Sequence, residues 1–249
     1  MTIASALVDA QRRGGQARPE SAEARRIQTR TYLFERTNEK LEYAMFASTK
    51  VKKDKKSPLV IALHGAGVSP REMLSFVAEA AQDGGYIVFA PMGYSLQGWY
   101  GIRDRLPAGS PANLAELSEL DVMTVLDMAR KEFNVDEQRI YLLGQSMGGA
   151  GALYLGVKHR EIWAAVGATA PAAGGLSPAS LEAAADVPMV LVHGDQDESV
   201  SVAQTRRWAD KMRELMMKFE YYEIRGGGHR DAIIEGASRV FAFFDKHPK

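Results

Sequence analysis

Short apolar runs alternate with amphipathic segments along most of this chain. The runs are rich in aliphatic and β-branched residues, which predicts buried strands. They lie at about residues 58–63, 86–90, 139–143, 163–169, 187–192 and 219–225. Segments between them, such as 118–133, carry apolar residues at near-helical spacing. Strands and helices that alternate in this way are typical of a mostly parallel sheet with helices on both faces. We therefore predict an α/β fold.

The pattern differs before residue 58. Thr31–Glu35 and Leu41–Phe46 alternate apolar and polar positions and flank a turn around Asn38, which predicts an antiparallel hairpin at the edge of the sheet. Residues 1–28 have weak periodicity and many Arg, Gln, Ala and Gly residues. We expect an N-terminal arm over 1–28 and a single catalytic domain over 29–249.

One motif stands where an apolar run meets a helix-like segment. The pentapeptide Gly144-Gln145-Ser146-Met147-Gly148 follows the run at 139–143 and precedes small residues at 150–157, which suit a helix packed closely on a sheet. A serine at a tight strand-to-helix turn has a strained backbone, and its neighbours must be nearly free of side chains. The motif predicts a nucleophile elbow at Ser146; the alternative is a glycine-rich turn with a structural serine.

A serine nucleophile requires a base and an orienting acid. Of the five histidines, His229 lies on a glycine-rich loop directly after the apolar run at 219–225, where α/β sheets place catalytic groups. The acid is one of three neighbouring carboxylates, Asp195, Asp197 and Glu198. We choose Asp197, because the spacing His-Gly-x-x-Asp places it past the first turn of its loop. Asp195 is the alternative, although its position favours bracing the turn.

The tetrahedral oxyanion of such a reaction needs fixed donors, which backbone amides supply best. We predict that the amides of Ala66 and Met147 form this oxyanion hole, because Ala66 lies just past the strand at 58–63 and Met147 follows the nucleophile. The long loop 92–111 carries aromatic and aliphatic side chains suited to a substrate pocket. The predicted pocket residues are Tyr94, Leu96, Trp99 and Tyr100. Alternatively, they cover the end of the sheet.

Together, the order Ser146, Asp197, His229 and the upstream His64-Gly65 resemble the α/β-hydrolase family, from about residue 30 to the C-terminus. Narrower motifs resemble bacterial esterases of the polyhydroxybutyrate-depolymerase and feruloyl-esterase group, whose members are also described as predicted peptidases related to prolyl oligopeptidase. These motifs lie at 90–94, 98–101, 145–149 and 161–166. The resemblance implies an α/β-hydrolase fold and ester hydrolysis. The short stretch between 169 and 187 predicts no large cap domain.

Composition excludes several other classes. The chain of 249 residues carries 31 basic and 31 acidic residues, so no net field favours nucleic acid or an anionic membrane. No apolar stretch approaches the ~20 residues that span a bilayer, and no signal peptide is evident. We expect a cytoplasmic protein, or one exported with its signal removed. With no cysteines and no cluster at ligand spacing, we expect no metal and no cofactor.

The sequence therefore predicts a serine carboxylesterase that acts on short-chain or small aromatic carboxylic esters. Its predicted partner is a small-molecule ester substrate. A serine peptidase acting on small peptides would use the same triad and is the first alternative. A non-catalytic binding module on the same fold is the second, because a fold alone does not establish function.

Overall fold

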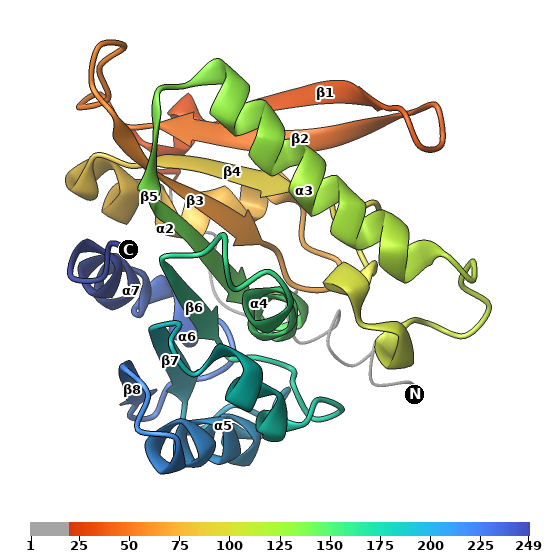
Figure 1. Cartoon of the computed structure of the whole chain (residues 1–249), viewed down its shortest axis with the longest axis vertical. Helices are drawn as coiled ribbons and strands as arrows, with labels where there is room; N and C mark the ends of the chain where they lie inside the picture. Colours follow the sequence, from red (N-terminus) through yellow and green to blue (C-terminus); the bar gives the residue numbers. More distant parts are fainter. Residues whose placement is uncertain (1–19) are drawn as a thin grey trace.

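The computed structural model describes residues 20–249 (Figure 1). Its strands are β1 (Gln28–Phe34), β2 (Glu39–Ala47), β3 (Ser57–Leu63), β4 (Ile87–Pro91), β5 (Val135–Gln145), β6 (Ala165–Thr169), β7 (Met189–Gly194) and β8 (Phe219–Ile224). Its α-helices are α2 (Pro70–Gly84), α3 (Leu114–Glu132), α4 (Met147–Lys158), α5 (Val202–Glu214), α6 (Asp231–Ile234) and α7 (Ala237–Asp245). Short 3-10 helices are η1 (Ala24–Arg26), η2 (Trp99–Gly101), η3 (Arg103–Arg105) and η4 (Pro178–Ala184).

The strands form one eight-stranded sheet in the order β1-β2-β4-β3-β5-β6-β7-β8. The pairs β1–β2 and β2–β4 are antiparallel, and every other pair is parallel. Parallel strands end at the same edge of a sheet, so the loops that follow β3, β5, β7 and β8 gather there. This edge receives all the predicted catalytic residues.

Helices cover both faces of the sheet (Figure 1). In β3, the side chains of Leu59, Ile61 and Leu63 pack on the face covered by α3, α4 and α5, whereas Val60 and Ala62 pack on the face covered by α2, α6 and α7. Successive side chains of a strand point to opposite faces, so a central strand covered on both sides is apolar throughout. This is why β3 has the uninterrupted apolar run that the sequence shows.

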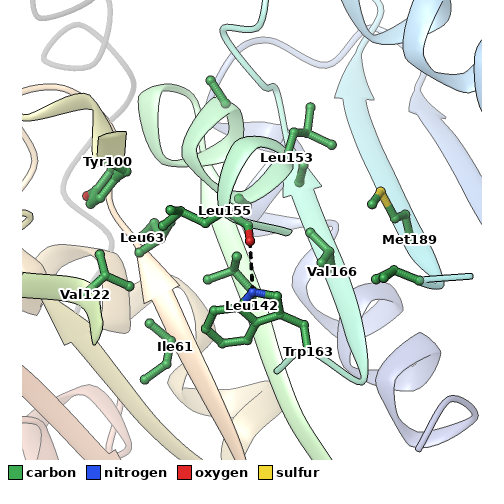
Figure 2. Close-up of a cluster of buried hydrophobic side chains, with 14 of the residues drawn as sticks. Ile61, Leu63, Tyr100, Val122, Leu142, Leu153, Leu155, Trp163, Val166 and Met189 are labelled. Carbon is green, nitrogen blue, oxygen red and sulfur yellow. Dashed lines mark hydrogen bonds between the residues drawn. The ribbon is translucent and has the colours of Figure 1, made fainter. Parts of the chain in front are cut away.

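Trp163 is a large residue with a polar atom in the core beneath α4. Its indole N–H donates to the carbonyl of Leu155 near the end of α4 at 3.1 Å (Figure 2). A buried indole that satisfies its donor contributes apolar contact area without an unpaired polar atom. The contact fixes the C-terminal end of α4 on the sheet, and α4 begins beside Ser146.

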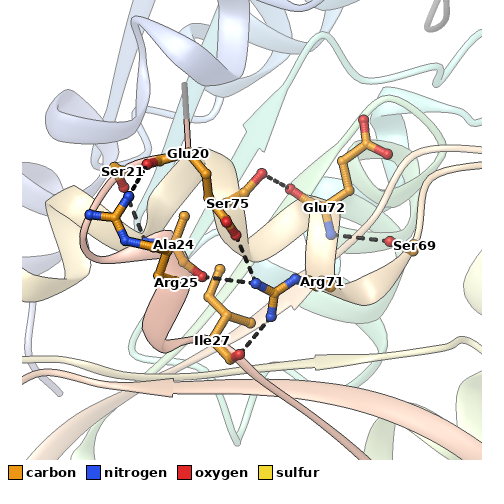
Figure 3. A network of polar contacts seen from close by, with 9 residues as sticks. All are labelled: Glu20, Ser21, Ala24, Arg25, Ile27, Ser69, Arg71, Glu72 and Ser75. Atoms are coloured by element: carbon orange, nitrogen blue, oxygen red, sulfur yellow. Dashed lines mark hydrogen bonds and ion pairs between the residues drawn. The ribbon is translucent and has the colours of Figure 1, made fainter. Parts of the chain in front are cut away.

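The segment before β1 is anchored to α2 by Arg71. Its guanidinium donates to the carbonyls of Ala24 and Ile27 and pairs with Glu20 at 2.7 Å (Figure 3). Ser69 caps the N-terminus of α2, because its hydroxyl accepts from the amide of Glu72 at 3.1 Å, and Pro70 is the first residue of the helix. Both features stabilise a helix N-terminus.

The predicted fold class is confirmed: a mostly parallel sheet with an antiparallel hairpin at its start and helices on both faces. Between β6 and β7 the chain forms only the short η4, so no large cap domain is inserted there. The predicted arm over 1–28 lies mostly outside the described residues, and β1 begins at its last position. No helix within residues 20–249 combines the length and apolar character needed to cross a membrane.

Candidate active site

Ser146 occupies the sharp turn between β5 and α4. Its backbone has φ 58° and ψ −116°, a conformation that residues with a side chain rarely adopt. Backbone hydrogen bonds fix this conformation: the Ser146 amide donates to Thr169 O at 2.9 Å, and its carbonyl accepts from Ala150 and Ala172 at 3.0 Å. Strain persists where the surrounding structure determines it, and such residues cluster at functional sites.

The two glycines of the motif are required by backbone contacts. A Cβ atom at Gly144 would lie 1.9 Å from the carbonyl oxygen of Gly148, and a Cβ at Gly148 would lie 2.1 Å from that of Leu63. No side chain can occupy either position without moving the backbone. The close contact at Gly148 also places the end of β3 against the start of α4.

His229 and Asp197 come together from two neighbouring loops. His229 follows β8, and Asp197 lies between β7 and α5. The His229 Nδ1 donates to Asp197 Oδ2 at 2.7 Å, and both side chains are buried, at 5% and 0% exposure. Because the carboxylate accepts from Nδ1, the Nε2 of His229 is the nitrogen that remains to take up a proton.

Asp197 has every acceptor position occupied. Its Oδ1 accepts from the amides of Ser199 and Val200, at 2.8 and 2.9 Å. The other two carboxylates of the loop lie elsewhere: Asp195 accepts from the amide of Gly226 at 2.7 Å, and Glu198 is exposed. The structure therefore brings Asp197 to His229 and leaves Asp195 to brace the loop after β8.

A second histidine, His193, also binds Asp197, a contact that the sequence did not predict. Its Nε2 lies 3.0 Å from Asp197 Oδ2 and 2.9 Å from Val200 O. Both partners are acceptors, so Nε2 carries a proton. The Thr205 hydroxyl lies 2.6 Å from Nδ1 and fixes the ring from the other side. The signal in the sequence was the His-Gly pair at the end of β7.

These contacts determine the ionisation of Asp197. Burial alone would raise the pKa of its carboxyl, but hydrogen bonds from His193 and His229 outweigh burial and hold this pKa well below its ordinary value of 3.8. Asp197 is therefore ionised in the folded protein at neutral pH. It can hold the imidazole of His229 in one tautomer and stabilise its charged form.

This lowered pKa predicts a pH dependence of stability. The carboxyl binds its proton more weakly in the folded chain than in the unfolded one, so its contribution is fully present above the unfolded value and decreases as the pH falls through and below 3.8. We expect Asp197→Asn to remove about 1.4 kcal/mol per pH unit from the acid slope of the unfolding free energy below that value. Urea unfolding of both proteins from about pH 2 to pH 5 measures it, and parallel slopes below pH 3.8 would contradict the assignment.

Ser146 and His229 each keep an unused polar atom. Within the described residues, Ser146 Oγ and His229 Nε2 are buried and have no hydrogen-bond partner, including each other. Buried polar atoms are rarely left unpaired. The structure therefore joins Asp197 to His229 by a hydrogen bond but does not join His229 to Ser146.

The two predicted oxyanion donors lie at the junction of β3 and α4. Met147 is the first residue of α4, where amides have no partner within the helix, and Ala66 lies in the turn after β3. Within residues 20–249, neither amide donates a hydrogen bond. The next residue, Gly67, donates to Leu96 O at 2.9 Å, which ties this turn to the loop after β4.

His64 and Tyr100 support the turn that contains Ala66. The ring of His64 is fully buried, with its Nε2 2.8 Å from Met92 O and its Nδ1 2.9 Å from Gly65 O. Burial lowers the pKa of His64 despite these carbonyls. The Tyr100 hydroxyl donates to His64 O at 3.1 Å. His64 therefore joins the end of β3 to the end of β4.

The predicted pocket residues separate into two groups. Tyr94 packs against Phe34 and its hydroxyl donates to Glu39, while Tyr100 is fully buried and packs on Gly151 of α4. Both have contacts that fix them in the body of the protein. Leu96 is 40% exposed, and Trp99 is buried with its indole N–H unpaired within the described residues. The pocket prediction therefore rests on Leu96 and Trp99.

No group of three or more ligand-type side chains within residues 20–249 is arranged to hold a metal ion. The chemistry available at this edge of the sheet is that of a serine hydroxyl, an imidazole, a carboxylate and backbone amides. Such a set suits acyl transfer.

The sheet order, the strained serine between strand and helix, and the histidine and aspartate on later loops define an α/β-hydrolase. Comparison with known proteins agrees. The chain belongs to the phospholipase/carboxylesterase family, whose model matches residues 45–235.

Curated relatives align with part of the chain. A bifunctional acetylxylan esterase/xylanase, XynS20E from Neocallimastix patriciarum, is 26% identical over 160 residues, which are 64% of this chain and 22% of the relative. NocK from Nocardia uniformis subsp. tsuyamanensis is 30% identical over 146 residues, which are 56% of this chain and 40% of the relative. The chain thus spans less than half the length of each of these two relatives.

Solved structures share the fold over most of the chain. A thermostable esterase superposes with a TM-score of 0.72 at 22% identity and covers 91% of this chain and 64% of its own. A ferulic acid esterase, AmCE1/Fae1A from Anaeromyces mucronatus, solved with ferulic acid, superposes with a TM-score of 0.69 at 18% identity over 89% and 90% of the two chains.

Proposed function

We propose that this chain is a serine carboxylesterase that hydrolyses short-chain or small aromatic carboxylic esters through an acyl-enzyme. One observation carries the proposal: a serine with a strained backbone at the β5–α4 turn stands at the same edge of the sheet as a histidine that donates to a buried aspartate. A strained backbone conformation costs free energy and persists mainly at functional sites. Here the strained turn presents the serine hydroxyl as a nucleophile, which accounts for the strain.

In the first half of the proposed reaction, His229 Nε2 takes the proton of the Ser146 hydroxyl as Oγ attacks the ester carbonyl. The free Nε2 and the free Oγ are the two atoms that this step requires, and hydrogen bonds of this kind often tighten only when substrate binds. The amides of Ala66 and Met147 stabilise the oxyanion, and each such donor contributes ~2.7–4 kcal/mol to barrier lowering. The imidazolium then gives its proton to the departing alcohol.

In the second half, a water molecule replaces the alcohol. His229 takes a proton from this water as it attacks the acyl-enzyme carbonyl, and the same amides stabilise the second oxyanion. Collapse of this intermediate returns the proton to Ser146 and releases the carboxylic acid. Asp197, ionised because of its lowered pKa, stabilises the imidazolium in both halves.

Two facts support small esters as the substrate class. The connection between β6 and β7 adds only η4, so no cap domain supplies a long enclosed tunnel for an acyl chain. The names of similar proteins point the same way, since one is an acetylxylan esterase and another is a ferulic acid esterase. Both names refer to esters of small carboxylic acids.

The test is hydrolysis of a p-nitrophenyl ester series from acetate to dodecanoate, with methyl ferulate and a peptide anilide in parallel. We expect turnover of the short-chain esters or of methyl ferulate, with activity falling for long acyl chains, and little cleavage of the anilide. Cleavage of the anilide at a rate comparable to the esters would favour the peptidase alternative. An absence of turnover on every compound would contradict the proposal and favour the binding module.

A further inference from the structure

Arg105, the last residue of η3, has no anionic partner among the described residues. Its side chain is half-buried, and within residues 20–249 it makes neither an ion pair nor a hydrogen bond. Burial lowers the pKa of Arg105, with no neighbouring acid to offset it. A guanidinium stays charged in proteins, so withdrawing it from water without a partner is unfavourable. The neighbouring Arg103, by contrast, is exposed and paired with Glu116.

The guanidinium of Arg105 packs on an aromatic ring. Its guanidinium carbon lies 4.7 Å from the centre of the Trp99 ring. The Trp99 side chain is 2% exposed, and its indole N–H has no acceptor within the described residues. Indole and guanidinium groups are donors only. Two donor groups in contact, neither with an acceptor in residues 20–249, leave a site for a ligand that supplies one.

The surroundings place this pair beside the candidate active site. A Cβ atom at Gly175 would lie 3.2 Å from Cδ of Arg105, so Arg105 rests against the loop that follows β6. The same loop contains Ala172, whose amide donates to Ser146 O at 3.0 Å. The three residues from Ala172 to Gly175 span at most about 11 Å.

Contacts of the turn that contains Ala66 also place Trp99 near the candidate active site. The amide of Gly67, next to Ala66, donates to Leu96 O at 2.9 Å, and Trp99 follows three residues later. Tyr100, next to Trp99, packs against Gly151 in α4, the helix that begins directly after Ser146. Arg105 and Trp99 therefore border the same end of the sheet as the serine, between the loops that follow β4 and β6.

We propose that Arg105 and the indole N–H of Trp99 bind a carboxylate on the substrate, so that the enzyme prefers small esters that carry a free carboxylate in their acid or alcohol part. The planar fork of a guanidinium matches the two oxygens of a carboxylate. This inference rests on the proposed esterase function and specifies the substrate class of that same site.

Matched substrate pairs test the inference on both sides of the ester bond. On the acid side, the mono-p-nitrophenyl ester of glutaric acid is compared with the p-nitrophenyl ester of its neutral half-amide. On the alcohol side, para-acetoxybenzoate is compared with para-acetoxybenzamide. Each pair differs in charge and little in size. We expect a higher kcat/KM for the anionic member of at least one pair.

Arg105→Gln is expected to lower kcat/KM for the preferred anionic ester by about 10- to 100-fold, the range typical of a hydrogen-bonded charge pair, and to change kcat/KM for the neutral ester by less than about threefold. Arg105→Lys keeps the charge without the fork and should recover only part of the preference. Arg103→Gln is the matched control and should leave both values unchanged. Thermal unfolding of each variant shows whether the fold is intact.

Three outcomes would overturn the inference. The wild-type protein could hydrolyse neutral esters at least as well as anionic ones in both pairs. Arg105→Gln could lower kcat/KM for both members equally, which would assign Arg105 to packing on Trp99 alone. Finally, a wild-type protein that hydrolyses no ester would overturn the proposed function and this inference together, whereas the first two outcomes leave the esterase proposal intact.

Discussion

Replacing Ser146 by alanine is expected to reduce ester hydrolysis by about 10⁴- to 10⁶-fold in kcat, because the variant has no nucleophile and keeps only the oxyanion donors and substrate binding. The hydroxyl has no hydrogen-bond partner within the described residues, so its removal leaves no buried group newly unpaired. The free energy of unfolding should therefore be unchanged or slightly higher. Steady-state kinetics on the preferred short-chain ester, together with urea unfolding, measures both effects.

A fluorophosphonate probe provides an independent readout of the same prediction. It should label the wild-type protein covalently, and peptide mapping should place the label on Ser146. Ser75→Ala is a suitable control, because Ser75 is exposed on α2 and its hydroxyl donates only to Glu72 O in the same helix. It should be labelled and active like the wild type. If Ser146→Ala kept its turnover or its label, another residue would be the nucleophile.

Replacing Gly144 by alanine should have the largest effect on folding. The added Cβ would meet the carbonyl oxygen of Gly148 at 1.9 Å and its carbonyl carbon at 2.3 Å, and these are backbone atoms that cannot rotate away. The turn between β5 and α4 would have to open, which would break the contact between α4 and the end of β3. We expect a loss of more than about 4 kcal/mol in the free energy of unfolding, at the upper end for single substitutions.

The control for this substitution lies in the same region of the molecule. At Gly228 an added Cβ would have Asp231 Oδ2 as its nearest contact, at 3.5 Å, and the backbone there does not require glycine. Gly228→Ala should unfold in urea within about 0.5 kcal/mol of the wild type. A Gly144→Ala protein that unfolded at the wild-type urea concentration would show that the turn is looser than its backbone contacts indicate.

Periodicity alone located the parallel strands to within a few residues, since buried strands require continuous apolar runs and β3 shows one. It failed at the start of β5. The prediction began this strand at 139, but β5 begins at Val135, and the stretch between Ser57 and Leu59 pairs irregularly with it. On the β5 side, the polar residues Asp136 to Gln138 lie in this irregular pairing, between Val135 and Ile140. A polar strand end carries no apolar signal.

The helix predicted over 118–133 shows a similar limit of periodicity: it identifies a helix but not the buried residues of that helix. The spacing of its apolar residues indicated a helix, and α3 is one, but Leu120 is 40% exposed while Val122 is fully buried. Near-helical spacing defines a broad apolar stripe, and which of its members are buried depends on the elements packed against it. The sheet and η2 pack against α3 and determine which of its apolar side chains are buried. Periodicity contains no information about these neighbours.

The sequence by itself determined the elbow at Ser146, because glycines on both sides of a serine after a strand leave few other structures that avoid a clash. It also determined the class of fold through the alternation of strands and helices. Only the tertiary structure showed that Asp197, and not Asp195, accepts from His229, revealed His193 as a second donor to the aspartate, and placed Arg105 on Trp99 with no ion pair among residues 20–249. The physical reason is distance along the chain: Asp197 and His229 are 32 residues apart, and only the neighbouring positions of β7 and β8 in the sheet bring them within hydrogen-bonding range.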